Sequence, residues 1–285
     1  MPQARTVNRS HRPDIAVAAG WPLARRVGLD GLAPGGRLLS ERLIRGAGIR
    51  TGDRVVDLLP GDGALGRLAT RHDLHSWTGV CLDRTAAKHV RKRVAGGGTI
   101  LGAPDRTGLD DGSATVVVAE GLLSGLSAPS KRAVLDEARR ILRPGGRIGL
   151  HELAVTAPAW DEAPAAAVVA NLSGHRDGSV HPLSDVEWRA LIESAGLTVV
   201  GTSTAPLMIP TLRDLVDDRG PVAGLRAAIR MAIPGGPGAR MRRAVEQLTR
   251  NRGRLTATVL IAERPLVGPL RSASANASTV ASGDA

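Results

Sequence analysis

Thiols are almost absent from this sequence, in which Cys81 is the only cysteine among 285 residues. A single cysteine excludes an internal disulfide framework, and it also excludes the iron–sulfur clusters and zinc sites that need several thiolates. The remaining candidate ligands, His151, Glu152, His175 and His181, lack the i, i+4 spacing of a helical metal site. The sequence therefore predicts no bound metal.

Aromatic side chains are scarce as well. The chain has no phenylalanine and no tyrosine, and its four tryptophans are Trp21, Trp77, Trp160 and Trp188. Proteins that bind single-stranded nucleic acid stack the bases on aromatic side chains. This composition argues against nucleic acid as a partner, despite a formal net charge of +11.

Long hydrophobic runs are also missing, although 42% of the residues are hydrophobic. The longest runs, such as 114–119 and 256–262, are far shorter than the roughly 20 residues of a membrane-spanning helix. The N-terminal segment from Ile15 to Trp21 is short and is interrupted by Gly20, which is unlike the core of a signal peptide. We therefore expect a soluble, cytoplasmic protein with an aliphatic core.

Basic charge is concentrated in an insert over residues 205–252, which holds nine arginines against four acidic residues. Helical periodicity over Val222–Ile233 sets Arg226 and Arg230 on one face, and the residues mostly on the other face are apolar: Leu225, Ala228, Ile229 and Ala232. Such a helix suits peripheral contact with an anionic lipid or an acidic membrane surface. An ordinary lid helix with a solvated face, in a chain with a coding bias toward arginine, is the alternative.

Short apolar segments typical of strands recur through the first half of the chain. They are Arg54–Leu59, Trp77–Asp83, Thr99–Ala103, Ala114–Glu120 and Arg147–Leu153. Helix-like stretches separate the first four, and a helix over Ser130–Leu142 with a turn at Arg143-Pro144-Gly145-Gly146 precedes the fifth. This alternation predicts an α/β fold with a parallel sheet and helices on its faces.

The second half begins with a different pattern. A helix is predicted over Ser184–Ala195, because Ser184 and Glu187 have the spacing of a capping box and Gly196 provides a stop. Two strand-like segments, Thr198–Ser203 and Leu255–Glu263, flank the arginine-rich insert. They can still pair, because the entropy of loop closure grows only slowly with loop length.

The clearest chemical signal is a glycine-rich turn between a buried strand and a helix, Arg54-Val-Val-Asp57-Leu-Leu-Pro-Gly61-Asp-Gly63-Ala-Leu-Gly66. Glycines allow the backbone to approach a ligand closely, and the N–H groups that begin a helix favour polar or anionic groups. Asp83 ends the second predicted strand, where a carboxylate can accept hydrogen bonds from both hydroxyls of a ribose. Together these features predict a nucleoside cofactor.

Several further segments stand in a characteristic order. They are Val55-Val-Asp57 with Gly61 and Gly63, Val80-Cys-Leu-Asp83, Asp111-Gly112-Ser113, Ala138-Arg-Arg-Ile-Leu-Arg-Pro144-Gly-Gly146 and Glu187-Trp-Arg-Ala-Leu-Ile-Glu-Ser-Ala195-Gly196. In this order they resemble class I S-adenosylmethionine-dependent methyltransferases, over roughly residues 38–205 and again over 255–265. The resemblance implies S-adenosyl-L-methionine as cofactor and a Rossmann-like sheet of seven strands, mostly parallel with the last antiparallel, carrying a helical lid insert.

The resemblance also implies roles for individual residues at the cofactor. The methionine part would lie along Asp57, Leu59, Gly61 and Gly63, the ribose at Asp83, the adenine between Ala103 and Pro104, and Glu120 would stand beside the cofactor. Three positions depart from the family pattern. Leu59 stands where a glycine is usual, Ala103 where the carboxylate that binds the adenine amino group is usual, with Asp105 two residues later, and Thr115 where an acid is common.

Candidate catalytic residues follow the fifth predicted strand. His151 and Glu152 would face the same cleft, and a histidine titrates near neutral pH as a general base must. A strand-end histidine beside a solvated acid is the alternative. His175 and His181 lie in a loop that could reach the cleft, Trp160 could line a substrate pocket, and Trp188 is expected in the core.

We therefore expect an enzyme that transfers a methyl group to a small or lipid-like molecule. The alternatives are a methyltransferase-like binding module weakened by Leu59, Ala103 and Thr115, and a nicotinamide-dependent oxidoreductase built on Gly61-x-Gly63-x-x-Gly66. The expected organisation is an N-terminal lid segment over 1–37, a methyltransferase domain over 38–265 with its insert at 205–252, and a disordered tail over 266–285.

Overall fold

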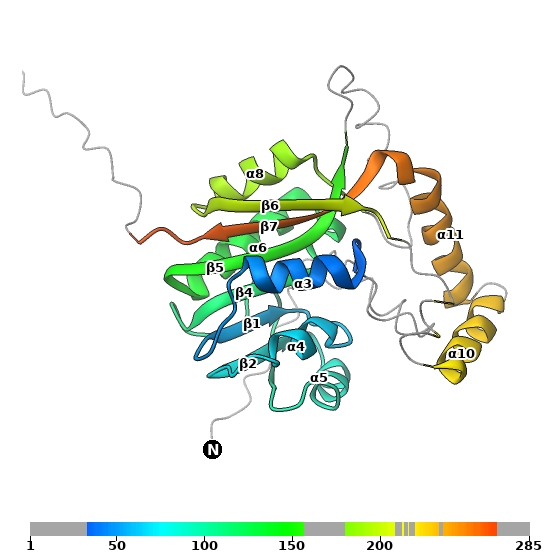
Figure 1. The fold of residues 1–285 in the computed structure, drawn as a ribbon, viewed down its shortest axis with the longest axis horizontal. Coiled ribbons are helices and arrows are strands. Elements are labelled where there is room, and N and C mark those ends of the chain that lie inside the picture. The colour runs from blue at the N-terminus through cyan, green and yellow to red at the C-terminus, as the bar shows by residue number, and fades with distance from the viewer. Residues whose placement is uncertain are drawn as a thin grey trace, which may run out of the picture.

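The computed structural model describes residues 33–156, 180–208, 213, 216, 220–233 and 236–266. The expectations for residues 1–32, Trp160, His175 and the tail beyond residue 266 lie outside this part of the chain. The described residues form a seven-stranded sheet covered by helices on both faces (Figure 1). This is the fold class that the sequence predicts.

The sheet has the strand order β3-β2-β1-β4-β5-β7-β6. Its strands are β1 (Arg54–Leu58), β2 (Ser76–Cys81), β3 (Gly98–Leu101), β4 (Ala114–Glu120), β5 (Leu142–Val155), β6 (Thr198–Pro206) and β7 (Leu255–Glu263). The first five strands are parallel, whereas β7 runs antiparallel between β5 and β6. The predicted pairing of β6 with β7 across the insert is confirmed.

Strand β5 differs from its prediction. It begins at Leu142, directly after α6 (Ala128–Ile141), so the predicted turn from Arg143 to Gly146 lies inside the strand. The backbone N–H of Gly145 donates to the carbonyl of Arg264, and the N–H of Arg264 donates to the carbonyl of Gly146. These two bonds extend the pairing with the chain that follows β7, and an irregularity against β4 absorbs the extra residues.

Helices cover the two faces of the sheet in separate layers. The remaining helices are α3 (Gly36–Gly46), α4 (Ala64–Ala69), α5 (Arg84–Arg91), α8 (Asp185–Ser194), α10 (Pro221–Ala232) and α11 (Pro237–Arg250), with short 3-10 turns η1 (Leu123–Gly125) and η2 (Arg252–Arg254). The capping box of α8 is present as predicted, with Ser184 and Glu187 bonded reciprocally.

Strand alternation divides the core into two clusters. Val55 packs in one cluster with the apolar faces of α3, α4 and α5, whereas its neighbour Val56 packs in the other with α6 and α8. Trp188 of α8 is fully buried in the second cluster, as expected, and its Nε1 donates to the carbonyl of Leu153 at 2.9 Å. Alternate residues of each strand therefore pack against different layers of helices.

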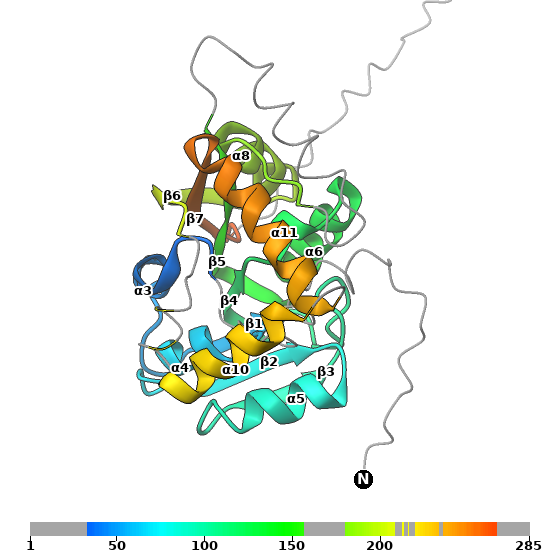
Figure 2. The same cartoon turned by 90° about the vertical axis from the view of Figure 1, so that its right-hand side faces the viewer.

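The two helices of the insert, α10 and α11, lie beyond the carboxyl edge of the parallel strands (Figures 1 and 2). They pack against each other and join η2, which leads into β7. Neither they nor any other helix within the described residues has the length and apolar character needed to cross a membrane.

Candidate functional site

The carboxyl ends of β1 and β4 meet where the strand order of the sheet reverses. The chain leads from β1 outward through β2 to β3, whereas β4 lies on the other side of β1. Open α/β sheets bind their ligands at such a switch point, outside the carboxyl ends of the strands. We therefore take this edge as the candidate site.

Three polar side chains reach this edge on one face of the sheet. Asp57 of β1 shares the face of Val55, which packs against α3 and α4. Glu120, two residues beyond Val118 of β4, lies on the same face, and its register partner across the strand pair is His151 of β5. Strand alternation therefore places Asp57, Glu120 and His151 on the same face of the sheet.

The glycine-rich turn after β1 holds an unusual backbone. Leu59 has a φ of 59°, in the left-handed region that leucine rarely adopts, and Gly61 and Gly63 also have positive φ values. A side chain at Gly63 would collide with Val94, because its Cβ would lie 2.7 Å from a methyl carbon. The turn therefore requires glycine at positions 61 and 63. Leu59 adopts a backbone conformation that would suit a further glycine.

Asp57 carries the strongest sign of a binding function. Its side chain is 1% exposed, and its Oδ2 atom has no hydrogen-bond partner in the described structure. Burial raises the pKa of Asp57 well above its usual value, and the nearby carboxylates of Glu120 and Asp62 raise it further. An unpartnered buried carboxyl oxygen is costly, so a ligand that donates a hydrogen bond or brings positive charge would relieve that cost.

Asp62 is buried as well, but it has partners in the protein. Its Oδ1 accepts from the backbone N–H of Ala64 at 2.9 Å, and its Oδ2 faces the guanidinium groups of Arg93 at 3.2 Å and Arg67 at 3.5 Å. These contacts fix the turn between β1 and α4. Asp62 therefore holds the shape of the turn.

A second polar group joins β4, β5 and the chain before α3. The Nδ1 of His151 lies 2.8 Å from Oε1 of Glu120, the Oγ of Ser40 donates to the same oxygen, and the backbone N–H of Gly35 donates to Nε2 of His151 at 3.0 Å. A backbone N–H can only donate, so Nε2 carries no proton and Nδ1 donates to the carboxylate. His151 is therefore a neutral imidazole with both nitrogens engaged.

The expectation that His151 and Glu152 follow the strand and face one cleft is wrong. Both lie inside β5, and consecutive residues of a strand point to opposite faces. Glu152 is fully buried toward the α6 layer, where its carboxylate accepts from the N–H groups of Leu122, Leu123 and Ser124 and from the Ser124 hydroxyl. Its task is to hold η1 against β5.

At the end of β2 the structure separates two neighbouring polar residues. Asp83 caps α5, with its Oδ1 accepting from the N–H of Ala86 at 2.7 Å, and its side chain is exposed. Cys81, the last residue of β2, is buried on the face of Asp57. Burial, aided by the charges of Asp57 and Asp83, raises the pKa of the Cys81 thiol to about 12, so this thiol is inert at neutral pH.

The loop after β3 contains the residues expected at the adenine. Ala103 and Pro104 are buried, and Ala103 supplies no polar atom. Asp105, however, has an Oδ1 atom that is buried and has no partner among the described residues. A second unsatisfied carboxylate oxygen therefore follows β3, two strands from β1 in the same sheet.

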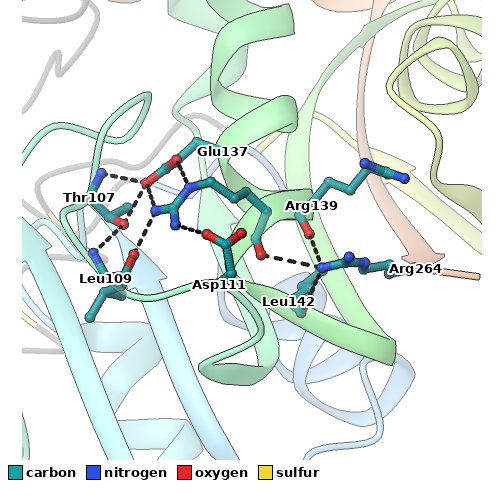
Figure 3. A network of polar contacts seen from close by, with 8 residues as sticks. Thr107, Leu109, Asp111, Glu137, Arg139, Leu142 and Arg264 are labelled. Atoms are coloured by element: carbon teal, nitrogen blue, oxygen red, sulfur yellow. Dashed lines mark hydrogen bonds and ion pairs between the residues drawn. The ribbon is translucent and has the colours of Figure 1, made fainter. Parts of the chain in front are cut away.

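An ion network holds this loop against α6 (Figure 3). Glu137 accepts from the N–H and the hydroxyl of Thr107, and it pairs with Arg140, whose guanidinium also reaches Asp111 and the carbonyl of Leu109. These bonds lower the pKa of Glu137 although burial opposes them. The i, i+3 spacing of Glu137 and Arg140 was the sequence signal for this pair, which the motif-based analysis missed.

Two further residues lie away from the candidate site. Thr115 stands near the amino end of β4, where its hydroxyl donates to Asp53 at 2.8 Å and its oxygen accepts from the backbone N–H of Arg54. The loss of an acid at position 115 therefore has no direct bearing on the carboxyl edge. The backbone of His181 is hydrogen-bonded to the core. Its N–H donates to the carbonyl of Ser124, and its carbonyl accepts from Nζ of Lys131.

The site combines buried carboxyl groups with a backbone turn shaped for close approach. No cluster of three or more metal-ligating side chains occurs among the described residues. Asp57 and Asp105 offer oxygens to hydrogen-bond donors, and Glu120, at 12% side-chain exposure, lies between the buried histidine and the edge. Gly35 and Ser40 join this site although no motif marked them, because only the fold brings α3 beside β5.

Residues 56–150 match the family model described as "Methyltransferase domain". They cover β1 to most of β5, including the glycine-rich turn, the β3 loop and Glu120. A curated relative, an uncharacterized protein of Haemophilus influenzae, is 23% identical over 222 residues, which make up 75% of this chain and 85% of the relative.

Solved structures with a similar fold include two enzymes. The cyclopropane synthase MmaA2 from Mycobacterium tuberculosis has a TM-score of 0.63 and 16% identity, covering 90% of this chain and 100% of that protein. A phosphoethanolamine N-methyltransferase of Haemonchus contortus, in complex with phosphomonomethylethanolamine and S-adenosylhomocysteine, has a TM-score of 0.60 and 13% identity, covering 87% of this chain and 58% of that one. At these identities the likeness concerns the fold.

Proposed function

We propose that this chain is a class I S-adenosylmethionine-dependent methyltransferase that transfers a methyl group to a small or lipid-like acceptor, a proposal supported by the match of residues 56–150 to a methyltransferase domain. The observation that carries the proposal is the buried carboxyl group of Asp57, which lies at the switch point with Oδ2 unpartnered. The cofactor of this family, S-adenosyl-L-methionine, carries an ammonium group and a sulfonium. Both charges are of the sign that a buried carboxylate needs.

The residues present fit this cofactor at three points. Asp57 would hold the positively charged methionine part beside the turn of Gly61 and Gly63, whose positive φ values set the shape of that turn. Asp105 would accept a hydrogen bond from the amino group of the adenine, in the role that Ala103 cannot fill. Asp83 would accept hydrogen bonds from the ribose hydroxyls through the carboxylate oxygen that does not cap α5.

When bound, S-adenosylmethionine supplies an electrophilic methyl group on its sulfonium. The chain's own contribution is to bind and orient, since proximity and alignment account for much of the rate of an in-line displacement. Burial at the sheet edge excludes water from Asp57 and strengthens its attraction to a cation. These residues therefore form a cradle of carboxyl groups for the cationic cofactor.

A proton leaves the acceptor only if the attacking atom carries one. His151 could accept it at Nε2 only after the N–H of Gly35 withdraws, because that N–H occupies the lone pair. Glu120 would then stabilise the imidazolium through Nδ1, and Ser40 would hold the carboxylate in place. Glu152 has no part in this route, because it faces the opposite side of the sheet.

The second candidate function is a binding module of the same fold without turnover. It is favoured by Leu59, which is 7% exposed and occupies a glycine-type conformation where the methionine part would lie. Nothing in the comparisons supports the third expectation, a nicotinamide-dependent oxidoreductase.

The test is a calorimetric titration of the protein with S-adenosylmethionine and with S-adenosylhomocysteine, followed by an assay for S-adenosylhomocysteine release in the presence of small-molecule and lipid extracts. Binding together with release that depends on the extract supports methyl transfer. Binding without release under any extract supports the module. Failure of both compounds to bind contradicts the assignment.

A further inference from the structure

Helix α10 presents its large apolar side chains to solvent and its small residues to the protein. Val222, Leu225 and Ile229 are 57–61% exposed, and Ile233 just beyond the helix is 52% exposed. Among the positions of the same helix whose burial is described, the buried ones are Gly224 and Ala227. A helix that served only to cover the domain would have the opposite arrangement, with its large apolar residues buried.

The last turn of α10 packs closely against the first turn of α11. A side chain at Gly238, in the first turn of α11, would lie 2.3 Å from the carbonyl oxygen of Arg230 and 2.3 Å from the Cα of Met231. The backbones of α10 and α11 therefore meet almost directly, and Ala239 beside this contact is buried. This contact fixes the rotation of α10, so its outward face is set by the fold.

The outward face combines an apolar stripe with basic residues. At 100° per residue, Val222, Leu225, Ile229 and Ile233 fall within about 80° of the helix circumference. Arg226 and Arg230 border one side of this stripe, and both are exposed. The sequence predicted these arginines on the face opposite most of the apolar residues. In the structure, the arginines and the apolar stripe lie side by side on the exposed surface.

From this surface we infer that α10 docks on an anionic lipid bilayer, with the apolar stripe entering the boundary between headgroups and acyl chains and the arginines contacting the headgroups. An apolar stripe gains by leaving water, and exposed arginines gain from anionic headgroups nearby. A second copy of this chain is a poorer occupant, since it would bring a like net charge of +11 against the arginines. The surface is complementary to an anionic layer.

The position of α10 gives this docking a consequence for substrate choice. Because α10 and α11 lie beyond the carboxyl edge of the strands, docking brings the candidate site to the side of the molecule that faces the lipid (Figure 2). A lipid-like acceptor then reaches the site without crossing bulk water. This consequence rests on the proposed methyl transfer, whereas the docking itself does not.

The experiment is co-sedimentation of the full chain with vesicles of phosphatidylcholine alone and of phosphatidylcholine with phosphatidylglycerol, at low and at physiological salt. We expect binding to the anionic vesicles that weakens as salt rises. Leu225→Ser with Ile229→Ser, and separately Arg226→Glu with Arg230→Glu, should each lower the partition coefficient by at least about tenfold.

Matched controls use the same substitutions elsewhere on the surface. Val186→Ser with Val200→Ser replaces two apolar residues that are 78% and 53% exposed, and Arg106→Glu with Arg143→Glu reverses two exposed arginines. Both controls should bind anionic vesicles as the unmodified protein does. Circular dichroism and S-adenosylhomocysteine affinity, measured on every variant, keep folding and cofactor binding separate from docking.

Three results would overturn the inference. They are no binding to either vesicle, equal loss in the control variants, and self-association in size-exclusion chromatography that disappears in the Leu225→Ser, Ile229→Ser variant while vesicles remain unbound. In the last case a second copy would be the occupant. Each result leaves the proposed methyl transfer standing if S-adenosylhomocysteine still binds.

Discussion

At the scale of single residues, Asp57 is where stability and function conflict. Its carboxyl group is buried beside two other carboxylates, and one oxygen has no partner among the described residues. Such a group destabilises the free protein and is retained when a ligand needs it. The fold therefore carries a local cost that the bound cofactor would offset.

The first prediction concerns Asp57→Asn in the absence of ligand. The folded-state pKa is raised, so below the unfolded pKa both states are protonated, and the wild type loses stability as pH rises from there through the folded pKa. The amide does not ionise. Relative to wild type, the variant should therefore become progressively more stable as the pH rises from about 4 to 7, measured as unfolding free energy by urea denaturation. A difference that stays constant with pH would contradict this.

The second prediction concerns Leu59, whose φ of 59° disfavours any residue with a Cβ. Both Leu59→Ala and Leu59→Gly should destabilise the protein, since the leucine is buried in the core. The glycine variant should nevertheless be more stable than the alanine variant by about 1 kcal/mol, the reverse of the usual order. Thermal unfolding of the pair decides this, and an alanine variant that is the more stable one would show that the turn has a different backbone in solution.

At the scale of elements, the short turn η1 depends on a carboxylate from β5. Glu152 accepts from three backbone N–H groups and one hydroxyl, all on the residues Leu122 to Ser124. Burial raises the pKa of Glu152, and these hydrogen bonds act against that rise. The element is therefore built around one buried side chain.

The third prediction follows from this arrangement. Glu152→Gln puts an amide group where one carboxylate oxygen accepts two donors, and each donor left without an acceptor should cost about 1–3 kcal/mol. Glu187→Gln, the same change in the exposed capping box of α8, is the matched control and should cost less than about 1 kcal/mol. Equal losses of unfolding free energy in the two variants would mean that Glu152 is no more than a surface acid.

Elements were well predicted where local signals were strong, as in β4 and β7, whose bounds agree with the prediction at both ends, and in the capped helix α8. The directions of the side chains were predicted less well. The placement of His151 and Glu152 failed because the predicted strand Arg147–Leu153 already contains both residues, and consecutive residues of a strand point to opposite faces. The further extension of β5 to Val155 comes from pairing with β7, about a hundred positions away. Pairing at that distance leaves no local trace.

At the scale of the whole molecule, the sheet order brings together residues that no motif joins. Gly35 and Ser40, near the start of the described chain, meet Glu120 and His151 because α3 packs across β5 and β7. The resemblance predicts the cofactor at the carboxyl edge, since Asp57, Gly61 and Gly63 carry the motif, and this stays a prediction. The sequence also named Asp105, two residues after the usual position, but it could not predict that one oxygen of Asp105 is buried without a partner in the loop that Glu137 holds through Thr107.

The central claim is that the carboxyl edge around Asp57 binds S-adenosylmethionine and its product. The most direct test is isothermal titration of wild type, Asp57→Asn and the surface control Asp136→Asn with S-adenosylhomocysteine, which retains the ammonium group. The wild type and the control should bind alike, and Asp57→Asn should bind at least about tenfold more weakly, a loss of roughly 1.4 kcal/mol. A wild type that does not bind, or an Asp57→Asn variant with unchanged affinity, would contradict the account.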